Sequence, residues 1–551
     1  MQTFSSNCTT PPEGVAFVGA PRIRGTLNIA WSCTLVLIAC TWSVLHLNVP
    51  TQSTLQPGNK LQKYRRTMFR TWTKVKWMLI NLVAPEYALG KAFSDYFSVK
   101  RLENRFKTWS ESDGVPWTAT HTHFANMGGF AVKFSPVANS TISQEDDHLI
   151  NGIELQDWPG FDLDTSVSAP ACLEHSGLAP AHPEYPSHQS LDTPLNWEPE
   201  RRHYAKLKIV RTLLDNARIR RLLDPETSYL LGVPPSKRIG ETDWQVDPTN
   251  AELVDIAVQT VDMCHFQNEA EFARFADGYG GVWACNIGCL KGNLWILDAN
   301  QLLMAREVGI IDKLPFLASD DLDDRNKQDL FLKLLALGQI SWFIFEIGSR
   351  LYRHLHISLL EVMVLAFSLC TIITYVLLLD KPNNATYTIT VPAARHPQTG
   401  PEMTRLGLAG PSMSAWGRTS LWIPNNAAHL DYPLDGSAAT EALQYTAWAS
   451  AASVFMFGSI HCIGWNFQFP THFEKIMWHA SSIITAVAIP TGIVFSTFMS
   501  LFGSYVTLSY LLFGVPFVAA RIFILVEVVR SLAYLPPDVF VTTWASEIPH
   551  A

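Results

Sequence analysis

The stretch that decides the fold is residues 330–379, LFLKLLALGQISWFIFEIGSRLYRHLHISLLEVMVLAFSLCTIITYVLLL. It contains two apolar runs, 330–347 and 357–379, joined by the short basic link SRLYRHLH. Each run is close to the roughly 20 residues that an α-helix needs to cross the hydrocarbon core of a bilayer. The stretch therefore predicts a hairpin of two membrane-spanning helices.

Four further apolar runs lie on either side of this hairpin, at residues 27–47, 443–463, 475–498 and 505–529. Residues 75–97 are ambiguous, because they are apolar enough for a marginal span but include Pro85, Glu86 and Lys91. A proline removes a helical hydrogen bond, and a carboxylate inside a bilayer is costly unless it is paired. This segment is consistent with a kinked span, a re-entrant segment or an interfacial helix.

The predicted fold class is mainly α: a multi-pass α-helical membrane protein of six or seven spans, with a large, mostly helical polar domain between the early and later spans. The expected divisions are a polar N-terminal tail (1–26), the first span with a basic loop and the ambiguous segment (27–97), the polar domain (98–329) with a Pro-rich insertion near 155–200, the two-span hairpin (330–380), an irregular Pro-rich loop (381–440), a three-span bundle (441–530) and a C-terminal tail (531–551). Within the polar domain, we expect irregular or β structure near 115–160 and an amphipathic helix at 292–309.

The composition agrees with this class and excludes others. Of 551 residues, 48% are hydrophobic and only 16% are charged, whereas soluble globular proteins are about a quarter charged. This composition excludes disorder and a collagen-like fibre, and nine cysteines are too few for a disulfide-dense scaffold. A net charge of −8 argues against nucleic acid as a partner, because phosphate binding requires a basic face.

The distribution of charge predicts the orientation of the first span. The segment before Trp77 carries no acidic residue from residue 51 onward and contains seven basic ones: Lys60, Lys63, Arg65, Arg66, Arg70, Lys74 and Lys76. The positive-inside rule places this basic segment in the cytosol and the N-terminus outside, in agreement with a glycosylation acceptor at Asn7. Further acceptor sites stand at Asn139 and Asn384.

Two topologies remain open. Seven spans would place the polar domain outside, with the acceptor site at Asn139, and would leave the C-terminus and the basic link of Arg350 and Arg353 in the cytosol. Six spans would leave both termini outside and the polar domain in the cytosol. The charge of the link favours seven spans.

Several segments resemble a large fungal group of multi-pass membrane proteins without an assigned activity. They are residues 24–50, 77–92 (WMLINLVAPEYALGKA), 117–132 (WTATHTHFANMGGFAV), 324–382 and 460–470 (IHCIGWNFQFP) with the spans that follow. The resemblance implies a membrane protein of a filamentous fungus. Because some members of the group occur beside secondary-metabolite genes, it also suggests the handling or the chemistry of a metabolite. It carries over no catalytic residue.

Ionisable groups in the apolar runs are the first functional candidates, because each must be paired, solvated or close to an interface. Glu346 and Glu361 lie about one helical turn from the basic link, so we expect both at the same membrane surface. They could act together in proton transfer or in stabilising a cation. We favour the structural alternative, in which they pair with Arg350 and Arg353 and fasten the hairpin.

Two further ionisable candidates, Arg521 and Glu527, lie in the last span. Their separation of six residues places them on different helical faces, so we do not expect them to pair with each other. Arg521 is expected to bind a carboxylate on another helix or an anionic ligand.

A pair of histidines is a weak candidate for metal binding. His121 and His123 would present two imidazoles on one face if their segment were extended. The spacing identifies no third ligand, so no metal and no cofactor is expected.

The predicted function is a receptor-like or scaffold role in an endomembrane or the plasma membrane. The expected partners are the lipid bilayer and, as a candidate ligand, a hydrophobic small molecule; the sequence predicts no oligomeric state. The alternative is a membrane-embedded enzyme acting on a terpenoid-, polyketide- or lipid-like metabolite through Glu346, Glu361, Arg521 or Glu527. A transporter ranks third, because no internal repeat is evident.

Overall fold

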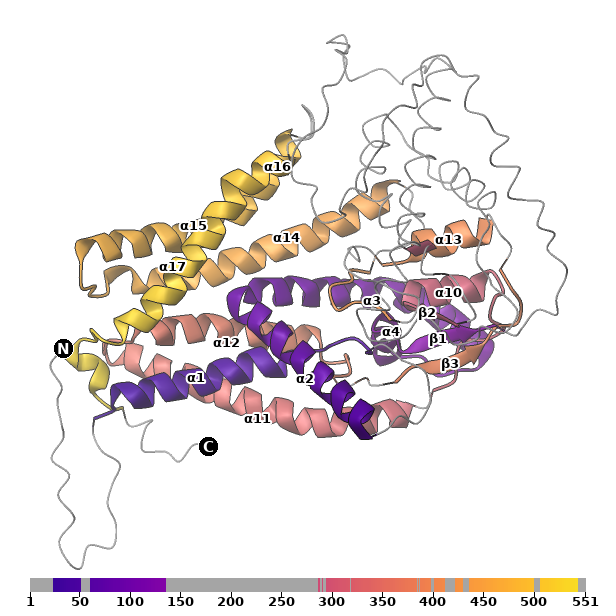
Figure 1. Cartoon of the computed structure of the whole chain (residues 1–551), viewed down its shortest axis with the longest axis horizontal. Helices are drawn as coiled ribbons and strands as arrows, with labels where there is room; N and C mark the ends of the chain where they lie inside the picture. The colour runs from indigo at the N-terminus through magenta and orange to yellow at the C-terminus, as the bar shows by residue number, and fades with distance from the viewer. Residues whose placement is uncertain are drawn as a thin grey trace, which may run out of the picture.

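The computed structural model describes residues 23–50, 60–134, 286–287, 290, 294–317, 319–383, 385, 387–397, 401–411, 422–429, 436–499 and 506–543. The three glycosylation candidates, Asn7, Asn139 and Asn384, lie outside these residues, as does the Pro-rich insertion near 155–200. The described part of the chain is mostly α-helical, as predicted. A bundle of long helices occupies one side of the molecule, and a small α/β unit lies at one end of it (Figure 1).

The bundle contains the predicted apolar runs. Its helices are α1 (Thr26–Ser43), α3 (Pro85–Asp113), α11 (Ser319–Tyr352), α12 (Leu359–Leu377), α14 (Gly436–His461), α15 (His472–Met499) and α17 (Val515–Ser531). Among the residues that the structure describes, four helices are long and apolar enough to cross a membrane, at Thr26–Ser43, Leu359–Leu377, His472–Ser496 and Leu511–Ser531. These are consistent with a membrane protein. The predicted runs at 330–347 and 443–463 lie in α11 and α14. Within the described residues, neither of these two helices is among those that are long and apolar enough to cross a membrane.

Helix α12 forms the centre of the bundle. In the apolar segment of α12, 72% of the residues are buried. The buried share is only 28% in α1 and in the helical segment Leu511–Ser531. Large apolar side chains such as Leu27, Trp31 and Ile522 are exposed on the outer helices. An outward-facing apolar surface of this kind is expected where lipid covers it.

Small residues allow the helices to approach closely. A Cβ atom on Gly458 of α14 would overlap the backbone of Ala486 on α15, and one on Gly90 of α3 would overlap the side chain of Ser450 on α14. Close backbone approach at small residues is the usual packing device of membrane helices.

The α/β unit combines segments from distant parts of the chain. It contains α4 (Ala119–Asn126), α10 (Ala299–Glu307) and α13 (Pro401–Ala409) beside a sheet of order β2-β1-β3. The strands are β1 (Phe130–Lys133), β2 (Leu294–Leu297) and β3 (Ile389–Pro392). Phe130 faces Leu297 in the antiparallel pair and Ile389 in the parallel pair. Irregular or β structure was expected near 115–160; the described part of this range contains the helix α4 as well as the strand β1, and residues 135–160 lie outside the described residues.

Two local predictions need correction in this unit. Residues 292–309 do not form a single helix, because β2 ends at Leu297. The carboxylate of the next residue, Asp298, accepts a hydrogen bond from Gln301 N (2.9 Å) and caps α10. The loop at 381–440 is not wholly irregular, since it supplies β3 and α13. The unit therefore draws on residues from both sides of the α11–α12 hairpin, and not only on 98–329.

The ambiguous segment 75–97 is divided between two helices. Helix α2 spans Lys60–Val83, the next residue, Ala84, is non-helical, and α3 begins with Pro85. Proline is well tolerated at the first position of a helix, because its missing N–H has no partner there. Pro85 therefore starts a helix and does not kink one. Helix α2 runs obliquely to the bundle helices and is held against α1 by a hydrogen bond from Asn81 Nδ2 to Thr41 O (3.3 Å) (Figure 1).

The two ends of the described chain meet at one end of the bundle. Ile23 forms an antiparallel bridge with Val541, and Arg24 N donates to Phe540 O (2.9 Å). Helices α1 and α12 run in the same direction, since Arg24 contacts Glu361 where they begin and Thr371 Oγ1 donates to Cys40 O (3.4 Å) near their other ends. The α/β unit lies at this second end.

Candidate functional site

Glu361 and Glu346 share one arginine at the end of the bundle where the chain ends meet. Arg24 Nη1 lies 2.6 Å from Glu361 Oε1 and 3.4 Å from Glu346 Oε1, and its Nη2 lies 3.2 Å from Glu361 Oε2. Glu361 also accepts hydrogen bonds from the backbone N (2.7 Å) and the Oγ (2.9 Å) of Ser358, which caps α12. The Glu361 carboxylate is therefore fully engaged in holding α1, α11 and α12 together.

The predicted partners of these carboxylates need correction, although both lie at one end of the bundle. Arg350 is fully buried and donates to the backbone carbonyl groups of Val541 (2.7 Å), Val539 (2.9 Å), His356 (2.9 Å) and Asp538 (3.2 Å). It therefore fastens the segment after α17, while Arg24 neutralises the carboxylates. Arg24 precedes the first helix by two residues and is remote in the sequence, so hairpin spacing alone could not identify it.

Arg521 binds a carboxylate on another helix, as expected. Its Nη2 lies 3.2 Å from Glu86 Oε2 in the first turn of α3, and its Nε donates to Val83 O (3.0 Å). Its guanidinium carbon lies 3.9 Å from the centre of the Phe457 ring. Arg521 and Glu86 are both buried. The pair therefore fixes the break between α2 and α3 against α17.

Glu527 stands apart from the other candidates. It is buried, and its Oε1 has no hydrogen-bond partner among the described residues. Arg530, the nearest basic residue on the same helix, pairs with Glu474 of α15. Neither of the two cavities described below is lined by Glu346, Glu361, Arg521 or Glu527. The four candidates therefore do not contribute to either of these two cavities.

The two histidines do not present a shared face, because their segment is the helix α4 and not an extended strand. His121 Nδ1 takes part in the cap at Thr118, and its Nε2 lies 3.0 Å from Leu317 O. Burial lowers the pKa of His123 to about 3, so this imidazole is neutral. No group of three or more His, Cys, Asp or Glu residues in the described part of the chain is arranged to hold a metal ion.

A buried ionic cluster joins the bundle to the α/β unit. Asp95 of α3 pairs with Lys91 (2.9 Å) and with Lys381 (2.6 Å), and Lys91 also donates to Ala427 O (3.0 Å). Burial alone would raise the pKa of Asp95, but the charges of Lys381 and Lys91 hold it well below its usual value. The spacing of Lys91 and Asp95 on one helical face could have been found in the sequence, whereas Lys381 could not.

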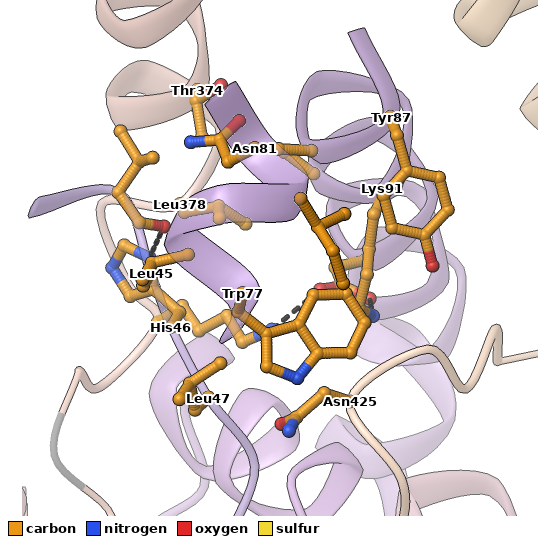
Figure 2. Close-up of a pocket in the computed structure, with 16 residues that line it drawn as sticks. Leu45, His46, Leu47, Trp77, Asn81, Tyr87, Lys91, Thr374, Leu378 and Asn425 are labelled. Atoms are coloured by element: carbon orange, nitrogen blue, oxygen red, sulfur yellow. Dashed lines mark hydrogen bonds and ion pairs between the residues drawn. The ribbon is translucent and has the colours of Figure 1, made fainter. Parts of the chain in front are cut away.

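Two neighbouring cavities lie beside this cluster. The smaller, of about 60 Å³, is lined by Lys91, Asp95 and Lys381 together with Trp77 and Asn81 of α2 (Figure 2). The larger is a groove of about 850 Å³ between α2, the end of α1 and the segments around 383–385 and 422–426. The two share four lining residues, namely Leu47, Trp77, Ile80 and Asn425.

The lining of the groove is aromatic and basic. Its tryptophans are Trp42, Trp72, Trp77 and Trp422, and its basic side chains are Arg70, Lys74 and Lys76. No Asp or Glu stands among the described residues that line it. Such walls suit a molecule with a large apolar surface. This groove was not among the predicted sites, although the alternation of tryptophan and basic residues in α2 could have indicated it.

The described part of the chain is thus mainly α-helical and contains four helices that are long and apolar enough to cross a membrane. The comparisons add one match: the sequence model of a family of unknown function, DUF8562, matches residues 1–154 and 304–403. The matched residues include α1, α2, α3 and the α11–α12 hairpin. No curated protein and no solved structure matches the chain.

Proposed function

We propose that the chain is a receptor-like membrane protein, without catalytic activity, that binds a hydrophobic small molecule in the groove beside α2. The observation that carries this proposal is the groove itself, about 850 Å³ in volume and walled by four tryptophans. The ionisable candidates for catalysis support a structural role instead, because Glu361, Glu346 and Arg521 are engaged in ion pairs between helices. The resemblance to a fungal group near secondary-metabolite genes suggests a metabolite as the ligand.

The proposed topology has six spans: α1, α11, α12, α14, α15 and α17, the last entered through α16 (Val506–Ser509) and a π-helical turn (Tyr510–Gly514). The pairing of Ile23 with Val541 supports an even number of crossings, because both ends of the described chain then lie on the same side. With the N-terminus outside by the charge rule, the C-terminus is outside as well.

Residues 60–113 act in this proposal as a re-entrant pair of helices. Glu86 contacts Arg521 in the interior of the bundle, whereas Asp95, further along α3, contacts Lys381 at the end of the bundle beside the α/β unit. Helices α2 and α3 therefore enter and leave on the same side. The seven basic residues of α2 then lie in the cytosol together with the α/β unit and the groove.

A site-resolved photolabelling experiment tests the ligand site. The full chain in lipid nanodiscs is illuminated with a 16-carbon alcohol carrying an alkyl diazirine, and the labelled peptides are identified by mass spectrometry. We expect saturable labelling of peptides from 67–80 and 422–426. Trp72→Ala should weaken it about fivefold, because an aromatic wall is lost.

Trp31→Ala is the matched control, since Trp31 is as exposed as Trp72 (65% against 64%) but lies on α1 outside the groove. It should leave the labelling unchanged. Labelling that does not saturate, or that is indifferent to Trp72→Ala, would contradict the proposed site.

A further inference from the structure

We infer that the ligand of the groove is an amphiphile with an anionic headgroup, such as a long-chain carboxylate or phosphate, which enters from the cytosolic leaflet. This inference rests on the proposed function, which requires only that the groove binds a hydrophobic molecule. The chemical class follows from the charges that line the groove and from the place of α2 at the membrane surface.

The charges of the lining are all of one sign. Arg70, Lys74 and Lys76 line the groove, and the described lining contains no carboxylate to balance them. Arg70 and Lys76 are exposed, and Lys74 Nζ lies 5.9 Å from the centre of the Trp42 ring. A groove whose walls carry charges of one sign focuses the electrostatic field and attracts a ligand of the opposite charge.

The lysines of the neighbouring cavity do not provide the headgroup contact. Lys381 and Lys91 are both paired with Asp95, and Lys91 also donates to Ala427 O. The headgroup is therefore assigned to Arg70 and Lys76, which are exposed and line the open groove. There, cationic side chains can form charge-assisted hydrogen bonds to a carboxylate or phosphate oxygen.

The outer surface of α2 places the groove at the boundary between headgroups and acyl chains. Tyr64, Met68 and Trp72 recur every four residues and are largely exposed, and Leu79 and Val83 continue the apolar surface. A basic helix with an exposed apolar face lies in this boundary, with its cations at the depth of lipid phosphates. The headgroup of an amphiphile in this leaflet therefore lies at the depth of the basic side chains of the groove, and its acyl chain lies at the depth of the apolar walls.

The experiment compares two photoreactive probes that differ only in their heads, the 16-carbon diazirine alcohol and the corresponding carboxylate. With the full chain in neutral nanodiscs, we expect half-maximal labelling of the groove peptides at about tenfold lower concentration for the carboxylate. Arg70→Gln combined with Lys76→Gln should abolish this difference. Lys107→Gln combined with Lys133→Gln removes the same charge from exposed positions outside the groove and should preserve it.

The possible outcomes separate this inference from the proposed function. Equal labelling by both probes, with no effect of the groove charge variants, overturns the anionic headgroup but leaves the hydrophobic site intact. An absence of saturable labelling by either probe overturns the proposed function as well. A third arm adds inorganic phosphate in excess. We expect no displacement of the carboxylate probe, and full displacement would overturn the amphiphile in favour of a free anion.

Discussion

Replacing Arg521 by alanine is expected to lower the free energy of unfolding by about 3–5 kcal/mol, because it leaves the Glu86 carboxylate buried without its counter-charge. Both side chains are buried, and the same guanidinium also donates to Val83 O. The measurement is the thermal unfolding midpoint of the purified chain in detergent, together with its yield in membranes. Single substitution of Glu86 by glutamine should act in the same direction, because Arg521 then loses its counter-charge.

A second variant keeps this prediction testable if the single variants fail to fold. Glu86→Leu combined with Arg521→Met replaces the ion pair by apolar side chains, and such replacements are often neutral or stabilising. We expect the double variant to recover most of the loss. Lys100→Ala is the control, since its pair with Glu103 on α3 is exposed and solvent screening should leave the thermal midpoint almost unchanged. A double variant as unstable as Arg521→Ala would contradict the assigned role.

Glu361→Gln is expected to have a much larger effect than Glu346→Gln. The Glu361 side chain is 2% exposed and is bound by Arg24 and by the Ser358 cap, so its substitution should cost about 2–4 kcal/mol of stability. Glu346 is 23% exposed and lies 3.4 Å from Arg24, so Glu346→Gln should cost less than about 1 kcal/mol. The thermal midpoint of each purified variant gives the measurement.

This pair of variants also distinguishes the structural role from the catalytic alternative. If Glu346 and Glu361 were catalytic, both variants would fold normally and neither would form the product. Normal stability of Glu361→Gln, with loss of a metabolite from the cells that express it, would therefore contradict the ion-pair assignment.

The sequence predicts those parts of the fold that depend on local pattern. A long apolar run identifies a helix within a few residues, as at 357–379 for α12 and 27–47 for α1, because every turn of such a helix carries the same signal. The sheet found in the described part of the chain does not follow from local pattern. Its three strands come from residues near 130, 296 and 390, and each is only four residues long, too short for periodicity to specify their pairing.

For the candidate site residues, too, the sequence predicts local features but not partners that are distant in the sequence. Sequence spacing argued against a pair between Arg521 and Glu527 and left two partners for Arg521, a carboxylate on another helix or an anionic ligand. It could not identify Glu86 as the carboxylate. The partner of Glu361 was predicted from the nearest basic link, whereas the structure supplies Arg24, which lies just before α1 and more than 300 residues away in the sequence. The groove was not predicted at all, because its walls come from segments that only the tertiary fold brings together.

The central claim is that six crossings place the groove and the α/β unit in the cytosol and both ends of the chain outside. The most direct test is the glycosylation pattern of the chain in microsomes, read as the mass lost on treatment with a glycosidase. The native acceptor at Asn139 is compared with an acceptor tag appended after Ala551, and the variant Asn139→Gln identifies the first site. The account predicts a glycan on the tag and none on Asn139. A glycan on Asn139 with an unmodified tag would contradict it and would require seven spans.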